Sequence, residues 1–234
     1  MEPLQLCIVW YIVFVFSTVF HEFSHAMVAY KFGDRTAAHH GLVTLNPIPH
    51  IQRSPVGMLV VPLLSFVHMQ WMIGWASVPY DPYWAHRYPK QAALMGLAGP
   101  AANLTLVIVA GILIHLGISA GIFFPPESIG FTRVVEAGAD GLAKGAAILV
   151  SILFTLNLLL CVFNLIPVTP LDGTALAEFI LKGDILYKYR ALMTHPTVRM
   201  FGIFIAWYVI GFIFSPIHLF AINALYMWRG IRYG

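Results

Sequence analysis

Long stretches of this 234-residue chain contain no charged side chain, and the clearest of them cover residues 4–20, 92–116, 145–164 and 200–227. An α-helix needs about 20 predominantly apolar residues to cross the hydrocarbon core of a bilayer. Only 10% of the residues are charged, whereas a soluble domain carries about 25%. We therefore expect an integral membrane protein. The net charge of +3 is too small to indicate a nucleic-acid partner.

The apolar stretches predict an all-α polytopic membrane protein with about four to six transmembrane helices. Pro3 suits a first helical turn and Gly33 a helix end, so the first helix should cover about residues 4–31. The last stretch is interrupted at Ser215-Pro216, which fits either one kinked helix or a tight hairpin. We predict a single membrane-embedded domain over residues 1–234, with a core at 4–181 and a C-terminal helical segment at 198–228.

The segment after the first helix differs from these spans. Residues 34–54 are rich in turn formers, and the alternating LVTL at 42–45 predicts a short strand. Residues 56–76 are apolar but contain polar residues and helix breakers, namely Pro62, His68, Gln70 and Gly74. We therefore expect a re-entrant or short membrane-associated β segment here, with its open backbone covered by protein or water.

The motif HEFSH places His21, Glu22 and His25 directly after the first apolar stretch. Residues i and i+4 lie on one face of a helix, so both imidazoles can bind one metal ion. Zinc bound by two histidines and a carboxylate keeps a fourth position for water and lowers the pKa of that water to about 7. Glu22 is then the candidate general base. Ionisable residues are costly in a membrane helix, so three together indicate a functional site rather than a chance pair of histidines.

A third ligand is needed, and Asp172 in NLIPVTPLDG is the candidate because it follows a span directly. Pro167 and Pro170 open the backbone just before it. Taken alone, Asp172-Gly173 fits an ordinary turn at a helix end equally well. Other candidates lie in the polar region that follows and are less attractive: Glu178, Asp184 and, as a reserve, His195.

The two motifs also restrict the topology. Asp172 can reach the histidines only if both spans run in the same direction, with one crossing between them, so residues 56–76 must not cross. Nine basic residues then lie on the side of the motifs, and only Arg133 and Lys144 lie on the other, apart from the tail after Pro216. If 56–76 crossed, the basic residues before the tail would divide as five against six, with no preference for either side. The positive-inside rule therefore favours the hairpin and a site near the cytoplasmic face. The nine are Lys31, Arg35, Arg53, Arg87, Lys90, Lys182, Lys188, Arg190 and Arg199.

Together, HEFSH, GLVTLNPIPH, GLAGPAAN and FNLIPVTPLDG resemble the site-2 protease family of intramembrane zinc metalloproteases. The resemblance extends from about Phe20 to Gly173 and is greatest to the compact prokaryotic branch that has no inserted PDZ domain. It implies a zinc metalloendopeptidase with one zinc ion at His21, His25 and Asp172, and Glu22 as the general base.

The resemblance also implies roles for two asparagines and one segment. Asn164 matches a family asparagine that holds substrate backbone, although a helix C-cap explains it equally well. Asn103 matches another family position, for which packing or an interhelical hydrogen bond is the better explanation. LVTLNPIPHI resembles a membrane-embedded strand that could bind an unwound substrate by strand addition.

The leading hypothesis is hydrolysis of peptide bonds in or near transmembrane segments of membrane proteins, as in regulated intramembrane proteolysis. It implies a membrane-protein substrate with a transmembrane helix, a lipid bilayer and, from the family branch, a prokaryotic cell membrane. The alternative is a zinc-binding transporter, since transporters also place His and Glu inside membrane helices. A second matching set of ligands for a transport path is not evident in the sequence. An inactive scaffold is a third option, but the intact HEFSH and Asp172 give no reason for it.

Overall fold

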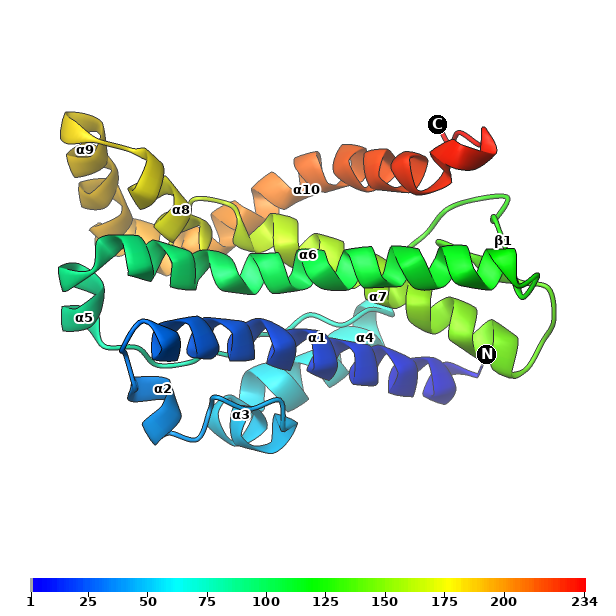
Figure 1. The fold of residues 1–234 in the computed structure, drawn as a ribbon, viewed down its shortest axis with the longest axis horizontal. Helices are drawn as coiled ribbons and strands as arrows, with labels where there is room; N and C mark the ends of the chain where they lie inside the picture. Colours follow the sequence, from blue (N-terminus) through cyan, green and yellow to red (C-terminus); the bar gives the residue numbers. More distant parts are fainter. Residues whose placement is uncertain (1) are drawn as a thin grey trace.

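The structure is a computed structural model that describes residues 2–234. Within this range four helices are long and apolar enough to cross a membrane. They are α1 (Pro3–Lys31), α6 (Pro89–Ser119), α7 (Leu142–Asn164) and α10 (Pro196–Tyr226) (Figure 1). The all-α membrane fold predicted from the sequence is confirmed, and Gly33 follows α1 with a φ of +97°.

Helix α6 packs against both α1 and α7. It runs antiparallel to these two, so α1 and α7 point in the same direction (Figure 1). The core contains buried side chains from all of the spanning helices, including Phe14, Ile114, Leu156 and Ile222. On α1, the face turned away from this core exposes Leu4, Ile8, Ile12 and Phe16 at a helical spacing, as expected for a surface that contacts lipid.

The segment between α1 and α6 does not cross the molecule. It forms α2 (Thr36–His39), α3 (Pro47–Arg53), a π-helix η1 (Val56–Val60) and α4 (Val61–Met69). An extended chain then returns to α5 (Pro82–Arg87), at the end of the molecule where α1 ends (Figure 1). The amide of Asp81 donates to Asp34 Oδ2 over 2.8 Å and so joins the returning chain to the end of α1. The segment therefore returns to the side from which it began, as the topology argument requires, and it does so with short helices and an extended chain in place of a β segment.

The predicted strand at 42–45 is wrong. These residues form bends that lead into α3, and the Asn46 side chain accepts a hydrogen bond from the amide of Ile48. Asn at the N-cap and Pro at the first helical position both favour a helix. The structure has its sheet elsewhere, in the connection from α6 to α7, where β1 (Phe123–Phe124) pairs antiparallel with β2 (Glu136–Ala137).

Three shorter elements complete the fold: α8 (Gly173–Ile180), α9 (Gly183–Thr194) and a final 3-10 turn, η2 (Met227–Arg229). Helix α10 continues through Pro216. The hairpin alternative is therefore wrong, and the chain crosses once more. The C-terminus lies at the same end of the molecule as β1 (Figure 1).

Candidate active site

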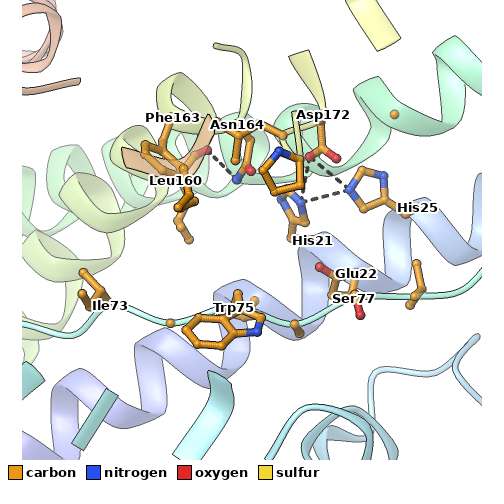
Figure 2. A pocket seen from close by; sticks show the side chains of 18 of the residues that line it. His21, Glu22, His25, Ile73, Trp75, Ser77, Leu160, Phe163, Asn164 and Asp172 are labelled. Atoms are coloured by element: carbon orange, nitrogen blue, oxygen red, sulfur yellow. Dashed lines mark hydrogen bonds and ion pairs between the residues drawn. The ribbon is translucent and has the colours of Figure 1, made fainter. Parts of the chain in front are cut away.

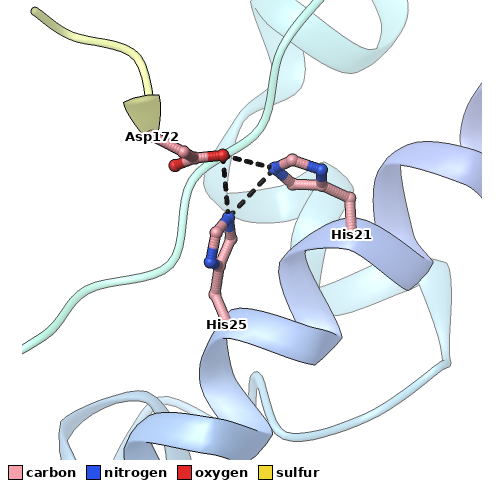
Figure 3. Close-up of side chains that lie close together, drawn as sticks. All are labelled: His21, His25 and Asp172. Atoms are coloured by element: carbon pink, nitrogen blue, oxygen red, sulfur yellow. Dashed lines mark hydrogen bonds and ion pairs between the residues drawn. The ribbon is translucent and has the colours of Figure 1, made fainter. Parts of the chain in front are cut away.

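The two histidines of HEFSH lie on the inner face of α1, where each is 7% exposed. Their Nε2 atoms are 3.0 Å apart, because positions i and i+4 are one helical turn apart. Figure 3 shows both imidazoles pointing to one place. The predicted convergence is therefore present.

Asp172 joins them from the other end of the chain. Its Oδ2 atom lies 3.1 Å from His21 Nε2 and 3.2 Å from His25 Nε2 (Figure 3). Asp172 occupies the N-cap position of α8, yet its side chain caps no amide. The carboxylate thus faces the histidines instead of closing an ordinary turn.

The other acidic and histidine candidates do not join this group. Glu178 pairs with Arg190 over 2.8 Å, and His195 caps α10 by accepting from the amide of Thr197. Asp184 lies on exposed α9. Within residues 2–234, His21, His25 and Asp172 form the one group of three or more His, Cys, Asp or Glu side chains that could hold a metal.

The hydrogen bonds around the group fit a cation. His21 Nδ1 donates to Asn103 Oδ1 and His25 Nδ1 donates to the Met95 carbonyl, each over 2.6 Å. Both partners are acceptors, so each Nε2 is left with a lone pair. Asp172 Oδ2 is buried and receives no hydrogen bond. Ligands about 2.0–2.1 Å from a tetrahedral zinc lie about 3.3 Å apart, close to the spacing of these three atoms. The residues therefore fit a zinc ion.

Close packing of glycines makes room for the group. A Cβ atom on Gly99 of α6 would overlap the Nε2 atoms of both histidines. A Cβ atom on Gly202 of α10 would overlap the carbonyl of Thr169, in the loop that leads to Asp172. Two helices thus approach the site through positions that have no side chain.

The group opens into a cavity of about 670 Å³. Glu22, which is 7% exposed, lines it beside the histidines. The extended chain after α4 forms one wall, with Ile73, Trp75 and Ser77, and the end of α7 forms the opposite wall (Figure 2). Away from the metal group the lining is mostly apolar: Val61, Ile73, Trp75, Leu160, Phe163, Ile203 and Trp207.

Asn164 also lines the cavity, at the last residue of α7 (Figure 2). Its Nδ2 atom donates to the carbonyl of Leu160 over 3.0 Å. This bond fixes the amide within the last helical turn, on the same wall as Asp172. Asn164 therefore lies beside the site, and its bond to the Leu160 carbonyl also fits the helix C-cap alternative.

Two polar groups outside the spans hold the site's loops. Tyr189 of α9 donates to the carbonyl of Pro167 over 3.1 Å. Burial and the nearby charge of Glu178 raise the pKa of Tyr189 to about 12, so the hydroxyl remains a donor at neutral pH. Burial would raise the pKa of Asp34, but hydrogen bonds from Thr36 and the Asp81 amide outweigh it and hold that pKa below its usual value.

Sequence reasoning missed several residues of this site. Trp75 and Trp207 line the cavity from segments far apart in the chain, and no local pattern marks them. Asn157 is different, because it is an amide within an otherwise apolar span and is fully buried. A polar residue inside a membrane helix is itself a signal of function.

The fold and this group of side chains define a membrane-embedded metal-dependent enzyme. Residues 9–209 match the model of peptidase family M50. The chain belongs to this family, the site-2 proteases, and is a zinc metalloprotease of the membrane.

Several curated proteins are similar to the chain. It is 32% identical to "Putative zinc metalloprotease YwhC" of Bacillus subtilis, over 88% of this chain and 83% of that protein. It is 27% identical to "Putative zinc metalloprotease Rip2" of Mycolicibacterium smegmatis, over 69% of this chain and 53% of that protein. It is also 27% identical to Rip2 of Mycobacterium tuberculosis H37Rv, over 86% of this chain and 68% of that protein. No solved structure matches. Because the chain belongs to a family of peptidases, hydrolysis is favoured over the transporter alternative.

Proposed function

We propose that this metalloprotease hydrolyses peptide bonds in or near transmembrane segments of membrane proteins, as in regulated intramembrane proteolysis. The observation that carries the proposal is the convergence of three electron-pair donors, within 3.0–3.2 Å of one another, at the wall of a cavity between membrane helices. The apolar remainder of that cavity suits the side chains of a transmembrane substrate.

In this proposal His21, His25 and Asp172 hold one zinc ion. When bound, zinc polarises the scissile carbonyl and lowers the pKa of water to about 7. Glu22 accepts the proton of the attacking water and returns it to the leaving amine. Asn164 orients the substrate backbone from the wall that it shares with Asp172, opposite the extended chain after α4.

A substrate helix must unwind before its carbonyls become accessible. The extended chain between α4 and α5 supports a route for this step, because it lies along the cavity in an open conformation. An unwound substrate segment can add to it as a strand. This role replaces the one expected for residues 42–51, which contain the start of α3.

We further propose that the site lies toward the cytoplasmic face of a prokaryotic cell membrane. The nine basic residues named above lie in the segments that connect the spans at the site's end or in the adjoining turns of those spans, where Lys31, Lys90 and Arg199 stand. With α10 crossing once more, Arg229 and Arg232 join Arg133 and Lys144 at the other end. The excess of basic residues supports a cytoplasmic site.

Replacement of Glu22 tests the chemistry. Glu22→Gln keeps the size of the side chain but removes the base, so cleavage of a co-expressed membrane substrate should be lost while zinc content is kept. Asp172→Ala should lose both. Glu127→Gln, in the exposed loop at the far end, is the matched control and should behave as wild type. Cleavage that persists in Glu22→Gln would contradict the assignment.

A further inference from the structure

A chain of buried amides connects α7 to one of the candidate zinc ligands. Asn103 of α6, Asn157 of α7 and Ser17 of α1 are each 0% exposed. His21 Nδ1 lies 2.6 Å from Asn103 Oδ1, and Asn103 Nδ2 donates to Asn157 Oδ1 over 2.8 Å. Asn157 Nδ2 in turn donates to Ser17 Oγ and to the carbonyl of Leu153, each over 2.8 Å.

The carbonyl of Leu153 sets the direction of this chain. A carbonyl oxygen can only accept, so the Nδ2 group of Asn157 must face it. Asn157 Oδ1 then faces α6 and accepts from Asn103, which leaves Asn103 Oδ1 toward His21. An acceptor at this position requires the proton of His21 to be on Nδ1. The Nε2 atom therefore keeps its lone pair.

We propose that Asn103 and Asn157 are positioning residues that fix the tautomer and ring orientation of His21 for metal binding. The inference rests on the proposed zinc ligation by His21. His25 obtains the same effect directly from the Met95 carbonyl, whereas His21 has no backbone carbonyl as its Nδ1 partner and depends on two side-chain amides. Partners of this kind orient metal-bound histidines and make them better ligands.

A purely structural role makes a different prediction. Side-chain hydrogen bonds between membrane helices, such as that of an asparagine pair, stabilise helix association. If helix association were the whole role of Asn103 and Asn157, removing another buried interhelical hydrogen bond of α7 should change zinc affinity by the same amount. Thr155 offers the comparison, because it is also 0% exposed on α7 and its Oγ1 lies 3.2 Å from His218 Nε2 of α10.

The test measures zinc affinity of the purified full-length protein by competition with a chelator. Asn157→Leu leaves Asn103 Nδ2 without its acceptor and allows that amide to turn its donor toward His21. Zinc affinity should fall by about 10–100-fold, and in the matched control Thr155→Val it should stay within about twofold of wild type. The double variant N103D/N157L should recover most of the affinity, because a carboxylate can only accept from His21 Nδ1.

The outcomes separate this inference from the proposed function. Loss of affinity in His21→Gln with none in Asn157→Leu would overturn the positioning role alone. Equal losses in Asn157→Leu and Thr155→Val, or no recovery in N103D/N157L, would also overturn it. Full affinity in His21→Gln would overturn the proposed ligand set. If Asn157→Leu does not fold, the wild type decides: nitrogen-15 spectra of the zinc-free protein must show the neutral His21 ring protonated at Nδ1, because without zinc only the hydrogen bonds around the ring select the tautomer.

Discussion

At the scale of single residues, Gly99 determines how closely α6 approaches the metal group. Gly99→Ala would place a methyl group on the Nε2 atoms of both histidines, and we expect zinc affinity to fall at least about tenfold. Gly111→Ala is the matched control on the same helix, since its Cβ would meet only a leucine methyl group at 3.4 Å. Chelator competition measures both, and equal affinities would contradict the packing argument.

The residues of the site differ in how far the sequence could predict them. His21 and His25 are predictable because their spacing within one helix already brings the imidazoles together. Asp172 needed the additional argument that two spans run in the same direction. Gly99 and Asn157 act through contacts between helices that are distant in the chain, and no local pattern specifies which helix faces meet.

At the scale of elements, Asp34 joins the end of α1 to the extended chain on the cavity wall. Its carboxylate accepts from the amides of Thr36 and Asp81, over 2.9 and 2.8 Å. Hydrogen bonds to a charged group contribute about 1.5–3 kcal/mol. We expect Asp34→Asn to lose a contribution of about this size at neutral pH, measured as a lower Tm in detergent.

The pH dependence of this contribution follows from the lowered pKa of Asp34. The stabilisation is fully present above the unfolded-state pKa of about 3.9. It is lost as pH falls through the lower folded-state value, because the carboxylate becomes protonated. Wild-type protein should therefore lose more stability than Asp34→Asn between about pH 7 and about pH 3. Glu127→Gln serves as the exposed control. If wild type and Asp34→Asn lost the same amount of stability on acidification, the assignment would be contradicted.

Helix α9 supports the loop before Asp172 through one hydroxyl. Tyr189→Phe removes the donor to the Pro167 carbonyl, and we expect a loss of about 1 kcal/mol in stability together with a lower kcat. The pKa of about 12 implies that this bond persists through the neutral and mildly alkaline range. Tyr187→Phe, on the same helix and 76% exposed, should leave both quantities unchanged. A kcat equal to wild type in Tyr189→Phe would show that the loop needs no such support.

The helices were predictable as elements because membrane spans require long apolar stretches. The short elements were not, because two-residue strands such as β1 and β2 depend on pairing across a loop. The strand expected at 42–45 rested on alternation alone. Asn46 and Pro47 were the stronger signal, since together they begin a helix.

At the scale of the whole molecule, the re-entrant segment makes the arrangement of the site possible. Because it returns to the side from which it began, only α6 separates α1 from α7, and these two helices run in parallel (Figure 1). The histidines and Asp172 therefore meet at one depth. A complete crossing by α4 would have placed Asp172 at the opposite end of the bundle.

The proposed orientation predicts which end of the molecule is accessible from outside the cell. Lys182→Cys lies at the end near the site and Arg232→Cys near the other end, and both positions are exposed. Each would be made after Cys7→Ala and Cys161→Ala, which remove the two native thiols. A membrane-impermeant thiol reagent added to intact cells should label Arg232→Cys and not Lys182→Cys, and permeabilised cells should show both. Because the basic residues concentrate at the end near the site, the positive-inside rule requires this result. Labelling of Lys182→Cys in intact cells would instead place the site toward the outer face.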